Sequence, residues 1–184
     1  MRSAMDSGEF DVKNPGWYPA SPSNYVAANR PNSEPIDTII LHVTQGSFAG
    51  TISWFSSPKS GVSTHYTIRS SDGFIAQSVR EKDIARHAGN WSYNQTSIGI
   101  EHEGYVENPT SFTEAMYLSS AKLVAYLARK YRIPADRQHI IGHDEVPNPN
   151  KPDRYGGAGG HQDPGLYWDW NKYMDLVNLY LSGV

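Results

Sequence analysis

Three residues far apart in the chain, His42, His143 and Asp163, have side chains suited to binding zinc. His42 follows the apolar run 38–41 and His143 follows the run 140–142, so each would emerge where a buried strand ends. Imidazole and carboxylate are zinc ligands, and three protein ligands that leave one position open are the arrangement of a catalytic zinc site. Spacing alone leaves two interpretations open, a metal site or histidines that are satisfied within a core.

The sequence around the last two of these residues is dense in histidine. Three of the seven histidines fall within residues 139–161. His139 starts the predicted strand that ends at His143, and an exposed or supporting position suits it better than a catalytic one. His161 shares one sharp turn with Asp163 and is an alternative ligand in its place. Strand ends and turns are rigid positions, which hold ligand atoms well.

The surrounding pattern predicts the elements that would position these groups. Short β-branched runs bounded by turn residues indicate strands, and an apolar period of 3.6 residues indicates helices. The predicted strands are residues 38–42, 63–69, 74–79, 97–104 and 139–143, the predicted helices are 47–55, 113–131 and 167–181, and residues 80–96 form a long connection. This order favours an α/β fold, a single domain in which helices flank a central mixed β-sheet.

The strand predicted over residues 97–104 offers two candidates for acid–base chemistry. Its period of two places Ile98, Ile100 and His102 on one face and Glu101 and Glu103 on the other. His102 shares the apolar face, so we interpret it as structural. Either glutamate could accept a proton in a reaction, and either could be a solvated residue at the strand edge.

Composition excludes several classes of partner. The formal net charge of −3 and the pI near 6.1 provide no basic field for nucleic acid or for an anionic membrane. No apolar run reaches the roughly 18 residues of a membrane span. The chain has no cysteine, which excludes disulfides and thiolate metal sites. We therefore expect a monomer without nucleic-acid or membrane partners.

Residues 1–35 are rich in proline, asparagine and serine, and we predict an irregular arm that packs over a body formed by residues 36–184. Met1–Phe10 lacks the apolar core of a signal peptide. This is compatible with a vector-derived leader joined to a mature exported enzyme, and equally with a phage protein that needs no signal.

Six short segments together resemble a known family, the zinc-dependent N-acetylmuramoyl-L-alanine amidases of type 2, which are relatives of peptidoglycan recognition proteins and amidase-type phage lysozymes. The resemblance extends from about Asp37 to Trp170. Its specificity comes from the order of the segments, because none is specific alone. In chain order they are Ile39–His42, Ser63–Tyr66, Arg86–Gly89, Ser97–Glu101, Gly142–His143 and Asp163–Gly165.

The resemblance implies a central mixed sheet with one Zn²⁺ in a surface groove, held by His42, His143 and Asp163. By matching position, Glu101 would be the acidic residue that activates water. Where the family often has a lysine near the transition state, this chain has His161. A histidine would assist if it is protonated or in the correct tautomer, and it would make activity more sensitive to pH than a lysine does.

Further positions complete the expected site. We expect substrate contacts from His65, His87 and Trp91, with packing or support as the alternative for the two histidines. The loop 144–160 is longer than in compact relatives; it is a surface excursion or a rim that contacts peptide or glycan, and an irregular pattern of oxygen ligands argues against Ca²⁺.

The function implied by the resemblance is hydrolysis of the amide between N-acetylmuramic acid and the L-alanine of the stem peptide. Peptidoglycan or muropeptides would be the partner, as expected of a wall-degrading endolysin or autolysin. Two alternatives are a recognition domain that binds peptidoglycan without cutting it and a zinc hydrolase that acts on another amide. Intact wall as substrate implies a secreted, wall-associated or phage-released protein rather than a cytoplasmic one.

Overall fold

A computed structural model of the chain describes residues 15–183, so the expectation for Met1–Phe10 lies outside the described residues. The central feature is a six-stranded sheet in the order β1-β5-β4-β7-β3-β8. Its strands are β1 (Gly16–Trp17), β3 (Thr38–Val43), β4 (Tyr66–Ile68), β5 (Ile75–Gln77), β7 (Ser97–His102) and β8 (Ile140–Gly142). Only β4 and β5 pair antiparallel among these neighbours. The predicted mixed sheet and its hairpin are confirmed.

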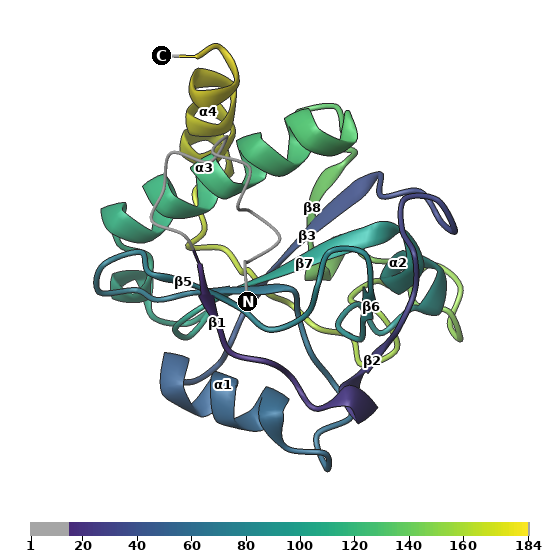
Figure 1. Cartoon of the computed structure of the whole chain (residues 1–184). Coiled ribbons are helices and arrows are strands. Elements are labelled where there is room, and N and C mark those ends of the chain that lie inside the picture. The colour runs from purple at the N-terminus through teal and green to yellow at the C-terminus, as the bar shows by residue number, and fades with distance from the viewer. Residues whose placement is uncertain (1–14, 184) are drawn as a thin grey trace.

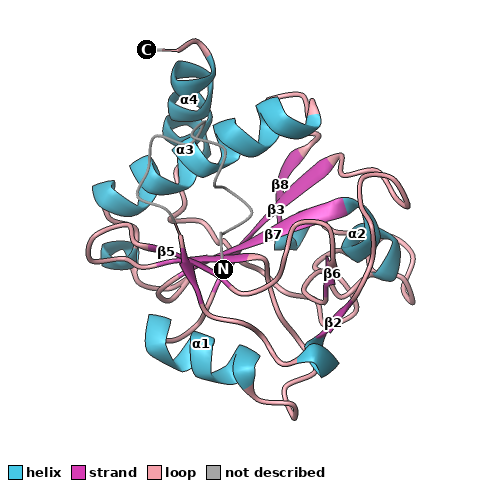
Figure 2. Ribbon diagram, viewed as in Figure 1, coloured by secondary structure: helices cyan, strands magenta, loops and turns pink. Residues whose placement is uncertain are grey.

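Helices cover both faces of this sheet (Figure 1, Figure 2). The helices are α1 (Phe48–Ser56), α2 (Trp91–Thr96), α3 (Glu114–Tyr131) and α4 (Trp170–Leu181), with 3-10 turns η1 (Pro22–Asn24), η2 (Pro109–Ser111) and η3 (His143–Glu145). In this view α3 and α4, which contact each other, lie on one side of the sheet and α1 lies on the other. Among the described residues, no helix has the length and apolar character needed to cross a bilayer.

The helix boundaries follow from their capping residues. The Ser47 side chain accepts a hydrogen bond from the Gly50 N–H at the start of α1, and Thr113 caps α3 through the Met116 N–H. The last helix begins at Trp170, three residues later than predicted, because the Asp169 side chain caps it. Trp168, which was included in the predicted helix, is instead buried in the core before the helix begins.

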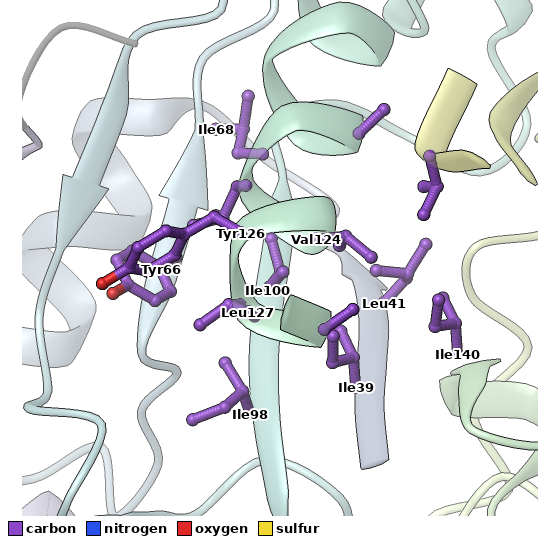
Figure 3. Close-up of a cluster of buried hydrophobic side chains, with 14 of the residues drawn as sticks. Ile39, Leu41, Tyr66, Ile68, Ile98, Ile100, Val124, Tyr126, Leu127 and Ile140 are labelled. Carbon is purple, nitrogen blue, oxygen red and sulfur yellow. The ribbon is translucent and has the colours of Figure 1, made fainter. Parts of the chain in front are cut away.

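The main core fills the space between the sheet and α3 (Figure 3). Alternate strand residues Ile39, Leu41, Ile98 and Ile100 point toward this helix and are fully buried. Strand residues between them therefore face the opposite side, where Ile40 packs in a smaller cluster and His42 lines a cavity. The period of two read from the sequence thus separates a packing face from a face available for a site.

Two segments differ from the predicted pattern. The N-terminal arm contains β1, which extends the sheet beside β5, and β2 (Tyr25–Val26), which pairs with β6 (Ile84–Ala85). The connection predicted over residues 80–96 contains β6 and α2. Arg30 of the arm is buried, and its guanidinium donates to the carbonyl oxygens of Asp83 and Ser97 at 2.7 and 2.8 Å. This arginine joins the arm to that connection.

Candidate active site

Three buried side chains converge where two parallel strands end. His42 lies near the end of β3, and His143 directly follows β8, whose Gly142 is paired with Leu41. The Nδ1 atoms of the two histidines are 3.1 Å apart, and they lie 3.4 and 3.2 Å from the carboxylate oxygens of Asp163. The three ligand atoms all lie within 4.8 Å of one another. The residues proposed as zinc ligands therefore form one cluster.

Charge and burial favour the protonation states that bind metal. Burial, reinforced by His143, lowers the pKa of His42 to about 4. Burial alone would raise the pKa of Asp163, but hydrogen bonds with His143 and His42 outweigh it and hold that pKa below its usual range. Neutral imidazoles and an ionised carboxylate are the forms in which these side chains bind zinc. The donor set thus fits a zinc ion.

Close packing between Gly142–His143 and Asp163–Gly165 brings His143 and Asp163 together. A Cβ atom at Gly142 would come within 2.6 Å of the Pro164 ring, so only glycine fits at this position. The Asp144 N–H donates to the Asp163 carbonyl oxygen at 3.0 Å. The turn that carries Asp163 is thereby held against the end of β8.

Glu101 lies in β7 and Glu103 directly follows that strand, and the two glutamates have different surroundings. Glu101 is paired with His42 in the sheet register and lines the same cavity as the three clustered residues. Its Oε2 is buried and has no hydrogen-bond partner among the described residues. Burial, and then the charge of Asp163, raise its pKa well above the usual value for a glutamate.

Both carboxylate oxygens of Glu103 are engaged in structural hydrogen bonds. They accept from the backbone N–H groups of Phe48 and Ser70 at 2.8 and 2.7 Å. Glu103 therefore joins the start of α1 to the turn after β4, and it is absent from the lining of the cavity. Of the two glutamates that the sequence left open, Glu101 is the one with a free carboxylate oxygen at the cluster.

The cluster lies at the bottom of an open cavity of about 290 Å³. A second cavity of about 330 Å³ continues from it along α1 and shares Glu101 and Phe55 with the first. The sequence did not indicate several lining residues, among them Val62, Thr64 and Arg86. Thr64 and Arg86 lie in two of the segments that carry the resemblance, and each directly precedes a predicted site residue.

Comparison with known proteins decides the family. Residues 32–166 match the sequence profile of the N-acetylmuramoyl-L-alanine amidases. N-acetylmuramoyl-L-alanine amidase A of Achromobacter lyticus is 40% identical over 182 residues, which cover 95% of this chain and 97% of that protein. The chain belongs to the N-acetylmuramoyl-L-alanine amidase family.

Solved structures agree in fold. The Staphylococcus aureus hydrolase AmiA, determined in complex with its ligand, superposes with a TM-score of 0.72 at 16% identity, over 92% of this chain and 84% of AmiA. AmpDh3 of Pseudomonas aeruginosa, in complex with an anhydromuramic pentapeptide, superposes with a TM-score of 0.57 at 18% identity. The superposition covers 94% of this chain and 65% of AmpDh3. The expected family, enzymatic activity and fold class are thus confirmed, and the family implies binding of peptidoglycan or muropeptides.

His161 of this amidase lies beside the cluster rather than within it. Its ring stacks on that of His143 at a centroid distance of 4.3 Å, and its Nδ1 is 4.0 Å from an Asp163 oxygen. The side chain is half-exposed and lines the groove. Burial and the adjacent His143 lower its pKa, which favours a neutral ring that donates through one N–H.

Two other predicted groove residues have different positions in the amidase. His87 lines the cavity, and its Nδ1 is 2.8 Å from the Nε2 of His42. His65 is fully buried between the Arg30 guanidinium, at 3.0 Å, and the Gly99 N–H, at 3.1 Å. His65 is thus enclosed in this structure, which agrees with packing, the alternative interpretation, while a substrate contact by His65 stays a prediction.

Trp91 begins α2 and is 47% exposed, but it is absent from the cavity lining. His102 is buried on the α3 face, where its ring nitrogens contact the His42 carbonyl oxygen at 2.9 Å and Ser120 Oγ at 2.7 Å, so its structural interpretation agrees with its position. His139 is partly exposed and contacts Asp136 at 2.6 Å, away from the cavity.

The loop 144–160 is folded against the groove. Its Ala158 N–H donates to the Gly89 carbonyl oxygen at 2.8 Å, and the Asn90 side chain donates to the Pro147 carbonyl oxygen at 3.0 Å. The loop lines a further cavity of about 570 Å³, which shares His161 with the cavity at the cluster. It is therefore a wall beside the site.

Proposed function

We propose that this amidase uses one zinc ion, held by His42, His143 and Asp163, to hydrolyse the amide between N-acetylmuramic acid and the L-alanine of the stem peptide. Zinc bound by such a donor set lowers the pKa of water to about 7 and polarises a carbonyl. Support for this assignment comes from the chemistry of the donors, which are two buried imidazoles and a carboxylate whose pKa is held below its usual range.

Glu101 would act as the general base. The observation that carries this role is its unpartnered Oε2, which lies on the strand next to His42 in a cavity shared with the cluster. The carboxylate would take a proton from the attacking water and pass it to the leaving nitrogen of L-alanine. Water then adds across the amide bond, the carbonyl carbon gains the hydroxyl, and the amine leaves neutral.

His161 would assist at the carbonyl oxygen. Its half-exposed ring is stacked on His143 and opens to the groove, so an N–H can reach a substrate that lies over the cluster. A donor aimed at an oxygen that becomes negative in the transition state contributes about 3 kcal/mol in comparable enzymes. The alternative in which His161 replaces Asp163 as a ligand has less support, since its ring lies beside the converging Nδ1 atoms.

The adjoining cavities indicate where the rest of the substrate would lie. One continues along α1 and the other is lined by the loop 144–160, and they meet at the cluster through Glu101 and His161. An extended ligand with a glycan part and a peptide part matches this arrangement. Intact wall as substrate would place the amidase outside the cytoplasm, by secretion or phage release, where it would act as a monomer.

Purified cell walls test this function. Incubation should produce stem peptides with a free N-terminal L-alanine and leave muramic acid with a free lactyl group. A chelator should stop this reaction, and added Zn²⁺ should restore it. Glu101→Ala should bind zinc normally yet lose about 10²–10⁴-fold in kcat, and Glu103→Ala, just after the same strand, is the control. Binding of walls without product would indicate a recognition domain, and full turnover by Glu101→Ala would contradict its role as the base.

A further inference from the structure

The outward-facing nitrogens of the two ligand histidines both contact one short segment, His87–Ala88. The Nε2 of His42 lies 2.8 Å from the Nδ1 of His87. The Nε2 of His143 lies 3.2 Å from the carbonyl oxygen of Ala88. The two Nδ1 atoms of the ligand histidines, in contrast, point toward Asp163. Each ligand ring therefore has one nitrogen at the cluster and the other on this segment.

The partners determine which nitrogen carries the proton. A carbonyl oxygen can only accept, so the Nε2 of His143 must carry a hydrogen, which leaves the Nδ1 lone pair free for a metal. For His42, the Nε2–H would donate to the Nδ1 of His87. The Nε2 of His87 would in turn donate to Ser97 Oγ, which lies 3.2 Å away. One continuous chain of hydrogen bonds thus leads from His42 to β7.

Segment His87–Ala88 is itself held by a buried amide. The Asn94 side chain is 7% exposed, and its Oδ1 accepts from the backbone N–H groups of both His87 and Ala88 at 3.0 and 2.8 Å. The His87 ring also rests on the backbone of β7, because a Cβ atom at Gly99 would come within 2.7 Å of that ring. The position of the segment is thus defined from two sides.

We propose that His87, Ala88 and Asn94 form a positioning device that orients the rings of His42 and His143 so that both Nδ1 atoms can bind one metal ion. The proposal rests on the proposed zinc site. It makes His87 a positioning residue: its Nδ1 is engaged by a ligand histidine and its Nε2 by a serine, so its polar atoms are used although its ring lines the groove. Groups that orient metal-binding histidines typically contribute 10–100-fold to metal affinity.

The test compares variants that remove or keep the acceptor. His87→Leu and Asn94→Ala remove it, whereas His87→Gln and Asn94→Asp retain an oxygen that can accept. Asn24→Ala is the matched control, because Asn24 is a buried asparagine that holds another loop by donating to the carbonyl oxygens of Phe55 and Ser57 at 2.7 and 2.8 Å. The measurements are the Kd for Zn²⁺ by chelator competition and the Tm of the metal-free protein.

His87→Leu and Asn94→Ala should weaken zinc binding about 10–100-fold, and the acceptor-retaining variants should recover part of the loss. Asn24→Ala should lower Tm without changing Kd. A Kd within twofold of the parent for His87→Leu would overturn the proposal, and so would equal losses in Asn24→Ala. If the parent protein itself binds no zinc, the proposed function is what fails.

A measurement on the unmodified protein covers the case in which these variants do not fold. Two-bond ¹H–¹⁵N spectra of the zinc-loaded protein report which ring nitrogen of each histidine carries a proton. His42 and His143 should both be Nε2–H tautomers, with His87 also protonated at Nε2. A proton on the Nδ1 of either ligand histidine would contradict the proposal.

Discussion

The two faces of the central sheet carry alternate residues of the same strands, yet the polar side chains of β7 have different hydrogen-bond partners on each face. On the α3 face, both ring nitrogens of His102 are engaged, and Ser120 continues the network to Tyr173 at 2.7 Å. On the groove face, Oε2 of Glu101 lacks a partner among the described residues, and His42 turns its Nδ1 toward another histidine nitrogen. Buried polar atoms are normally paired, so the unpartnered Oε2 of Glu101 indicates a place for a ligand on the groove face, whereas the His102 network joins β7 to α3.

Removal of a proposed metal ligand should give the largest effect, because the proposed chemistry depends on the metal. Asp163→Asn preserves the shape of the side chain and an acceptor for the Val43 N–H, which the native carboxylate accepts at 3.2 Å. The charge that the metal needs is lost. We expect a loss of stoichiometric zinc and a fall in wall hydrolysis of about 10⁴-fold or more. Metal analysis and product release check this. Full activity of Asp163→Asn without zinc would contradict the assignment of the groove face to a metal site.

Ile100 and Glu101, neighbours on β7 that point to opposite faces, form a matched pair. Ile100 is fully buried against α3. Ile100→Ala should cost about 2–5 kcal/mol through the lost contacts and the cavity left behind, which lowers Tm by roughly 5–15 °C for a domain of this size.

Glu101→Ala should leave Tm unchanged or raise it, because it removes a buried carboxylate oxygen that has no partner. Thermal unfolding of both variants in the metal-free form measures the difference, since bound metal would add to the apparent stability. A lower Tm for Glu101→Ala than for Ile100→Ala would reverse the assignment of the two faces.

The sequence predicted most of what depends on local pattern. The alternation in β7 separated Ile98 and Ile100 from Glu101, and the apolar runs before His42 and His143 placed both histidines at parallel strand ends. Capping residues Ser47 and Thr113 marked two helix starts. Strand alternation and helix capping each depend on residues that lie within a few positions of one another, so the sequence alone reveals them.

What the sequence could not predict depends on contacts between distant segments. Residues 91–96 show no apolar period and form only a short helix, so neither α2 nor the role of Asn94 was visible. His65 and His87 had the same two interpretations from the sequence, but only the packed structure shows that Arg30 encloses one and that the other meets His42. Glu103 was separated from Glu101 by the position of α1, which the pattern of β7 does not contain.

Glu103 offers a smaller test on the groove face, where it is the fully satisfied counterpart of Glu101. Glu103→Ala leaves the Phe48 and Ser70 N–H groups without their acceptor. We expect a cost of about 1–3 kcal/mol in the free energy of unfolding and near-normal zinc affinity. Denaturant unfolding measures it, and Glu103→Gln, which retains one acceptor oxygen, should lie between. A loss of kcat as large as that of Glu101→Ala would return Glu103 to consideration as the base.

The smallest expected effect concerns two exposed tryptophans, one of α1 and one of α2. Trp54 of α1 is 53% exposed and lines the cavity that continues from the cluster, whereas Trp91 of α2 is 47% exposed and lies outside that lining. A contact of an aromatic ring with substrate is worth about 1 kcal/mol, which corresponds to a rise in KM of about fivefold with kcat unchanged.

Trp91→Ala and Trp54→Ala, assayed on the same muropeptide, locate the substrate relative to α1 and α2. A rise in KM for Trp91→Ala alone would support its predicted substrate contact and place the ligand toward α2 and the loop 144–160. A rise for Trp54→Ala alone would place the ligand along α1 and remove Trp91 from the site. Because both tryptophans are exposed, neither change should alter Tm, so a changed KM reports binding on the groove face and leaves the stability set by the α3 face untouched.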